Sequence, residues 1–85
     1  MGLVSQLTDL GAIKRIEQFV GRTILTIDLI EPAALQLNIG QIVLIDGTNE
    51  LTVRGLNLWP DKTKIDILID NGVVGICEGQ MLSVA

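Results

Sequence analysis

The sequence predicts an all-β fold, a small six-stranded barrel that is closed or nearly closed and forms one domain over residues 1–85. Three observations lead to this prediction: apolar residues alternate with polar ones, turn residues recur at short intervals, and the chain repeats itself. A chain of 85 residues is long enough for one domain and too short for two.

Alternation with a period of two marks the strands. In the segment 23–29, Thr23, Leu25, Ile27 and Leu29 share one face. Segment 65–69 alternates in the same way, and segment 42–45 is a continuous apolar run typical of a strand buried on both sides. Leu51 and Val53 add a further short alternation. These segments predict short strands of an all-β domain.

Turn signals separate the strands. They stand at Gly21, 46–49, 60–61 and 70–72, and Asn71-Gly72 is the strongest hairpin candidate because both residues tolerate positive φ. The one segment with helical character is Pro32–Gln36, which allows about a single turn before Gly40. Short strands at this spacing favour a barrel over an α/β unit.

An internal repeat relates residues 13–45 to residues 53–84. At an offset of forty positions, Phe19 coincides with Trp59, and the alternating segment 25–29 coincides with 65–69. After one deletion, Gly40-Gln41 coincides with Gly79-Gln80. Either the chain is duplicated, or similar strands match by chance. Duplication predicts two copies of strand, strand, loop, strand about a pseudo-twofold axis.

Several short motifs also resemble a known family. They are Gly2-Leu3-Val4, Gly11-Ala12-Ile13, Ile16-Glu17, 39–43, Asp46-Gly47, 51–53 and 79–84. In this order they resemble the lumazine-binding domain of riboflavin synthase. The resemblance implies a β-barrel and, as an alternative function, a flavin- or lumazine-binding module.

The chain departs from that family at positions the family uses for its ligand. Met1 directly precedes Gly2, where the family has Phe-Thr, and Asn49-Glu50 replaces a small residue or cysteine. The threonine-bearing segment that cradles the ring is missing, since only residues 70–75 separate the last two predicted strands. The resemblance therefore concerns the frame of the barrel more than a ligand site.

Composition argues against several classes of function. Ten acidic residues outnumber six basic ones, which disfavours nucleic acid as a partner. The absence of histidine and tyrosine removes the usual catalytic bases, so we expect no enzyme. The N-terminus lacks a signal-peptide pattern, and no apolar run is long enough to cross a membrane, so we expect a cytoplasmic or virion location.

The sequence also allows expectations about the environment of a few individual polar residues. Cys77, the only cysteine, is expected to be buried and inert beside Ile76. Asp28 and Asp66 are expected to be ordinary charges that face solvent. Segment 46–50 offers oxygens for a hard cation, but it lacks the ligand spacing of an EF-hand loop, and a side chain that caps its own turn explains them better. No cofactor or metal site is otherwise indicated.

The interface candidates are Phe19, Leu58, Trp59 and Pro60. Trp59 before Pro60 is typical of an interface anchor, and the alternative is a pair of aromatic plugs that close the two ends of the barrel. The chain is 48% hydrophobic, which either fills the barrel or leaves surface for a second copy. The leading hypothesis is a homo-oligomeric structural or assembly protein, such as a phage cement or decoration protein.

Overall fold

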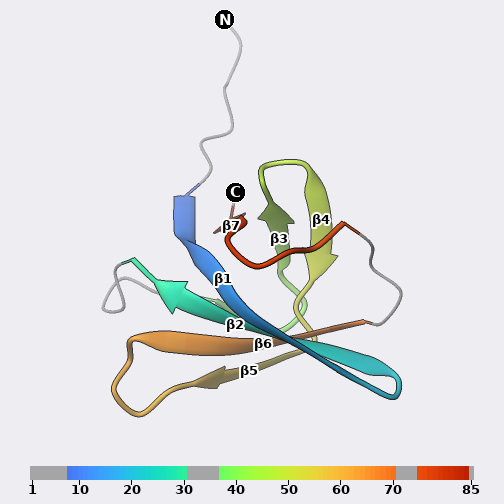
Figure 1. The fold of residues 1–85 in the computed structure, drawn as a ribbon, viewed down its shortest axis with the longest axis horizontal. Helices are drawn as coiled ribbons and strands as arrows, with labels where there is room; N and C mark the ends of the chain where they lie inside the picture. The colour runs from blue at the N-terminus through green and yellow to red at the C-terminus, as the bar shows by residue number, and fades with distance from the viewer. Residues whose placement is uncertain (1–7, 31–36, 71–74, 85) are drawn as a thin grey trace, which may run out of the picture.

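The computed structural model describes residues 8–30, 37–70 and 75–84, and every strand in this part of the chain is antiparallel to its neighbours (Figure 1). Seven strands form one sheet in the order β4-β3-β7-β1-β2-β6-β5. Their bounds are β1 Thr8–Phe19, β2 Arg22–Leu29, β3 Ile42–Ile45, β4 Asn49–Thr52, β5 Gly55–Leu58, β6 Lys64–Asp70 and β7 Met81–Val84. The all-β prediction is confirmed.

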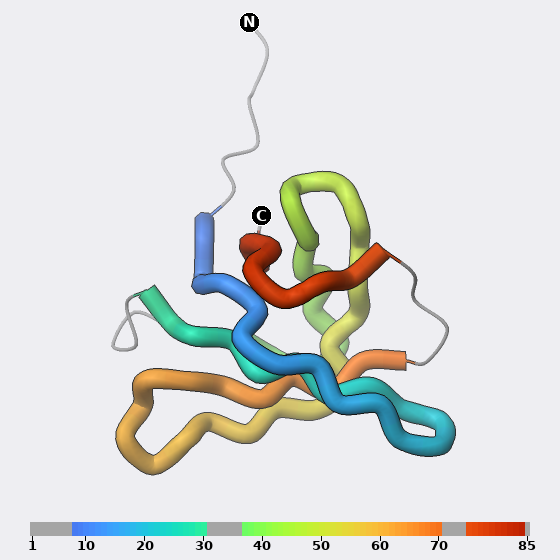
Figure 2. The backbone as a smooth tube through the Cα atoms, viewed as in Figure 1, coloured from blue at the N-terminus to red at the C-terminus, as the bar shows by residue number. Residues whose placement is uncertain are grey.

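The predicted six-stranded closed barrel is wrong, because the sheet has seven strands and curls into a half-barrel (Figure 2). The extra strand arises where one extended segment changes neighbours at Val53 and Arg54. Before this point β4 pairs with β3, and after it β5 pairs with β6. The amide of Val53 donates to the carbonyl of Gln41 at 2.9 Å, and the amide of Arg54 donates to that of Leu68 at 2.7 Å.

The hairpin predicted at Asn71-Gly72 requires the strands before and after it to pair, and this prediction is also wrong. The strands that flank it, β6 and β7, are separated in the sheet by β1 and β2. Turn propensity marks where a chain reverses, but it does not select the partner strand. Asn71-Gly72 itself and the helical turn predicted at Pro32–Gln36 lie outside the described residues.

The core lies on the concave side of the sheet and follows the predicted alternation. The inward side chains of β2 and β6 form its centre, since Leu25, Ile27 and Ile67 are fully buried. The buried apolar residues are Leu10, Ile13, Leu25, Ile27, Val43, Ile45, Leu51, Val53, Ile65, Ile67, Ile69 and Leu82. Burial of this aliphatic cluster is the main stabilising term of the fold.

Strand β1 holds the two sides of the sheet together. It pairs with β7 near its start and with β2 along most of its length, and its register shifts at two places. Such irregularities bend a strand and increase its twist, which promotes the curl. At one of them a Cβ on Gly11 would overlap the carbonyl oxygen of Asp28, so only glycine allows this close approach of β1 to β2.

The same backbone bonds recur at positions forty or thirty-nine residues apart. The amide of Ile13 donates to the Gln80 carbonyl at 2.8 Å, as that of Val53 does to Gln41 at 2.9 Å. The amides of Gly79 and Gly40 donate to the carbonyls of Ile13 and Val53, both at 2.7 Å. The two glycines have φ values of 91° and 92°.

Candidate interaction surface

The side chains of β2, β5 and β6 that point away from the core form a surface that we call the outer face. Its position follows from the register, because Ile24 lies opposite Leu68 while the buried Leu25 lies opposite Ile67. The outer face carries Arg22, Ile24, Thr26 and Asp28 from β2, Gly55 and Asn57 from β5, and Lys64, Asp66, Leu68 and Asp70 from β6.

A shallow groove of about 310 Å³ crosses the outer face. It is lined by Arg22, Ile24, Gly55, Leu56, Asn57, Asp66 and Leu68. Arg22 and Ile24 also line a neighbouring hollow of about 270 Å³ with Phe19 and Val20. Gly55 has no side chain to cover Leu68, so the apolar floor of the groove stays open toward the edge of the sheet.

Asp66 organises the polar end of the groove. Its Oδ1 accepts a hydrogen bond from Thr26 Oγ1 at 2.7 Å, and Thr26 is buried. Its Oδ2 accepts from Trp59 Nε1 at 3.1 Å and from Asn57 Nδ2 at 3.3 Å. Three donors from β2, β5 and the residue after β5 thus converge on one carboxylate, which ties the three segments together.

Trp59 makes a second side-chain contact just after β5. Lys64 Nζ lies 5.4 Å from the centre of the indole ring and 3.8 Å from Asp28 Oδ1. The backbone continues the ladder, because the Trp59 amide donates to the Lys64 carbonyl at 3.0 Å. A cation over the ring and a carboxylate on its N–H fix the orientation of the large side chain on the outer face.

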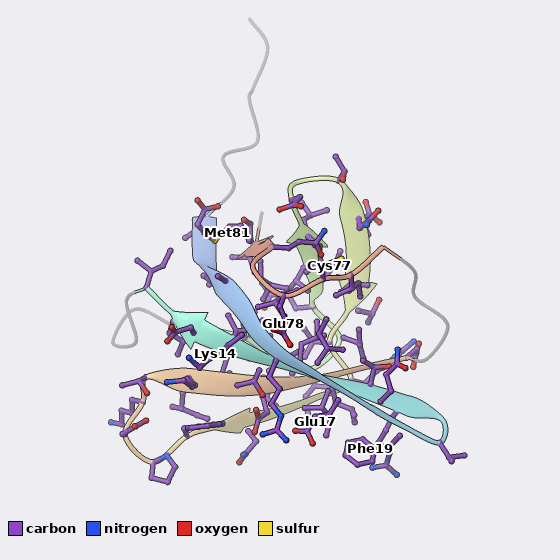
Figure 3. All side chains as sticks on the ribbon, in the orientation of Figure 1. Lys14, Glu17, Phe19, Cys77, Glu78 and Met81 are labelled. Atoms are coloured by element: carbon purple, nitrogen blue, oxygen red, sulfur yellow. The ribbon has the colours of Figure 1, made fainter. Side chains whose placement is uncertain are left out.

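The predicted interface residues lie in two places. Leu58, Trp59 and Pro60 are contiguous at the end of β5, and Leu58 is 43% exposed. Phe19, 48% exposed, lies at the tip of the β1–β2 hairpin, which projects at the opposite end of the molecule from the β5–β6 loop (Figures 2 and 3). Neither ring belongs to the core, so the structure does not support plugs of a barrel interior.

The paired acidic residues differ from each other. Asp28 is exposed, as expected, and its nearest cation is Lys64. Asp66 is half-buried and accepts three hydrogen bonds, so the expectation of an ordinary solvent-facing charge is wrong for it. Sequence alternation placed Asp66 on the correct face, but its donors become neighbours only when β2, β5 and β6 align.

Cys77 is exposed, and the prediction of a buried thiol is wrong (Figure 3). The residue lies in a turn before β7, where Ile76 instead packs against the core. The turn is held by Gln80, whose Oε1 accepts from the Cys77 amide at 2.7 Å. In the same way Gln41 Oε1 accepts from the Asn38 amide at 3.1 Å.

In segment 46–50 the side chain of Asp46 bonds outside its own turn. Asp46 Oδ1 accepts a hydrogen bond from the Met81 amide of β7 at 3.2 Å, so this carboxylate links the β3–β4 hairpin to another strand. Within the described ranges, no group of three or more acidic, cysteine or histidine side chains is placed to hold a metal ion. No helix described in these ranges is long and apolar enough to cross a membrane.

No protein-family model matches the chain, and neither the curated proteins nor the solved structures compared with it include a similar one. The outer face therefore has to be interpreted from its own geometry. That geometry offers an apolar groove, an oriented tryptophan, and charged side chains at both ends of β5.

Proposed function

We propose that this chain is a non-catalytic interaction module that assembles with copies of itself. The observation that carries the proposal is the outer face, where an open apolar groove adjoins an edge strand and exposed apolar side chains. Contiguous apolar surface of this kind marks protein–protein contact sites. A larger protein assembly, such as a virion with a cement or decoration protein, is the setting that we propose for it.

The anchors of this surface fit the proposal. Interface energy concentrates in a few large, pre-oriented side chains, with tryptophan and arginine prominent among them. Trp59 is held in place by Asp66 and Lys64 before any partner arrives, so little side-chain entropy remains to be lost on binding. Arg22, at the junction of the groove and the hollow, has no ion pair with another described residue.

The mass of the protein in solution tests this function. Light scattering and sedimentation over a range of micromolar concentrations are expected to give a mass above that of the single chain. A monomer at every concentration would overturn the proposal. A flavin or lumazine module, which the family resemblance implies as the alternative, would instead change riboflavin fluorescence on titration with the monomeric protein.

We also infer that residues 13–45 and 53–84 are two copies of one unit. The support is geometric: Thr26 and Asp66, forty positions apart, lie directly opposite each other in the β2–β6 pair. Leu44 and Ser83, thirty-nine positions apart, do so in the β3–β7 pair. Two strand pairs centred on equivalent residues are what a twofold axis between two copies requires.

A further inference from the structure

The outer edge of β5 carries backbone groups that the sheet leaves open. In an antiparallel ladder alternate residues bond to the neighbouring strand. Because the Trp59 amide bonds to Lys64 of β6, Asn57 also turns its backbone toward β6, and Leu56 and Leu58 turn theirs away. No described residue forms a backbone hydrogen bond with these outward groups of Leu56 and Leu58.

Two of the side-chain features that usually prevent pairing are missing from this short strand. Proteins blunt edge strands with charges, prolines or a covering segment. The four residues of β5, Gly55–Leu58, include neither a charge nor a proline. At the other edge of the sheet, β4 carries the exposed Glu50. Of the two edges, β5 is therefore the one suited to accept another strand.

We propose that two copies of this chain pair antiparallel through β5, with Asn57 of one copy opposite Asn57 of the other. The inference rests on the proposed self-assembly and names its interface. In this register Leu56 of each copy lies opposite Leu58 of the other, so the open N–H and C=O groups of both residues find partners. A shift by two residues would bring in Arg54, whose amide already donates to Leu68.

The same register makes the outer faces complementary. A twofold axis through the Asn57 pair keeps both outer faces on one side of the joined sheet. Gly55 then lies opposite Trp59 of the second copy. The glycine leaves its position on the outer face without a side chain, so the indole of Trp59, which Asp66 and Lys64 of its own copy hold, meets no bulky side chain across the axis.

Charge explains why the occupant is a second copy. The whole chain has a net charge of −4, which opposes self-association, but the two ends of the β5 edge have opposite signs. The start of β5 has two basic residues and one acidic residue near it, Arg22, Arg54 and Asp70. The end of β5 has one basic residue and two acidic residues near it, Lys64, Asp28 and Asp66. Antiparallel pairing therefore places the basic end of each copy beside the acidic end of the other.

A cysteine at the axis tests the register directly. In the Cys77→Ser background, Asn57→Cys places two thiols in a non-hydrogen-bonded pair, where the Cα atoms lie about 4.5 Å apart and a disulfide is possible. Under mild oxidation we expect a covalent dimer on non-reducing gels. The matched control, Glu50→Cys in the same background, is exposed on the other edge strand and is expected to remain a monomer on the gel.

A proline tests the hydrogen bonds. Leu58→Pro removes an amide that faces away from β6, so the ladder inside the chain stays intact and the fold is expected to survive. The dimer loses two of its four backbone bonds, and its Kd is expected to rise about 30-fold or more. Glu50→Pro on β4 is the control and is expected to leave the Kd unchanged.

The outcomes separate the interface from the function. If the wild-type protein is an oligomer, but Leu58→Pro leaves the Kd unchanged and Asn57→Cys does not cross-link, pairing through β5 is overturned while self-assembly stands. If the wild-type protein is a monomer at every concentration, self-assembly itself fails. If Leu58→Pro does not fold, as judged by circular dichroism, the cysteine variants decide alone.

Discussion

The carboxylate of Asp66 is expected to stabilise both the fold and the outer face, and Asp66→Ala measures this contribution. The substitution removes three acceptor contacts, of which the bond from the buried Thr26 hydroxyl matters most. A buried donor left without a partner costs about 1–3 kcal/mol, whereas the donors of Asn57 and Trp59 can turn to water. We therefore expect a loss of about 2 kcal/mol in the free energy of unfolding.

Urea unfolding followed by the fluorescence of Trp59, the only tryptophan, is the assay. For a domain of this size the expected loss corresponds to a fall in Tm of roughly 8–16 °C. Thr26→Val is the partner substitution, and the double variant is expected to be less destabilised than the sum of the two single ones. A loss under about 0.5 kcal/mol for Asp66→Ala, or strict additivity, would refute this account of Asp66.

Further substitutions test other parts of the structure. Gly11→Ala is expected to cost more than about 3 kcal/mol, or to prevent folding, since its Cβ would overlap a backbone carbonyl of β2; normal urea unfolding would contradict this. Gln41→Ala and Gln80→Ala are each expected to lower stability by about 1 kcal/mol or more, since each side chain accepts a hydrogen bond from a backbone amide of its turn, and no measurable loss in either variant would contradict this. The hydrogen bonds from the amide and hydroxyl of Thr63 lower the pKa of Asp61 below 3.8, and an NMR titration midpoint at or above that value would contradict this. Because the pKa is lowered on folding, the stabilisation by Asp61 is present above the unfolded-state pKa and is lost as the pH falls through the folded-state value.

Much of the fold could be predicted because it depends on local pattern. The alternation in segments 23–29 and 65–69 predicted which side chains of β2 and β6 face the core. The paired Gly40-Gln41 and Gly79-Gln80 marked two turns that the structure shows in the same conformation. Periodicity fixes such features because it reports on each strand separately.

The rest depends on which distant segments meet. The division of the chain at Val53 and Arg54 follows from the curl of the sheet, since the Val53 amide bonds to Gln41, next to β3, and the Arg54 amide bonds to Leu68 of β6. The prediction that Cys77 is buried relies on its apolar neighbours in the sequence. It is wrong because the residue lies in a turn, where alternation does not apply. The contacts of Asp66 combine side chains of β2, β5 and the residue after β5, and alternation within a single strand does not indicate which of these segments meet.

The pairing of β1 with β7 has a consequence for how the protein folds. Thr8 lies opposite Val84, seventy-six positions away, and the β2–β6 and β3–β7 pairs join segments about forty residues apart. A folding nucleus made only of hairpins between consecutive strands does not contain these three non-local strand pairs. The chain therefore loses the conformational entropy of closing long loops before the hydrogen bonds of these pairs stabilise it. We expect slow folding, on the millisecond-to-second scale of domains with mostly non-local pairing. During that time β5 is exposed as an uncharged strand, and association of the incompletely folded chain competes with the native route.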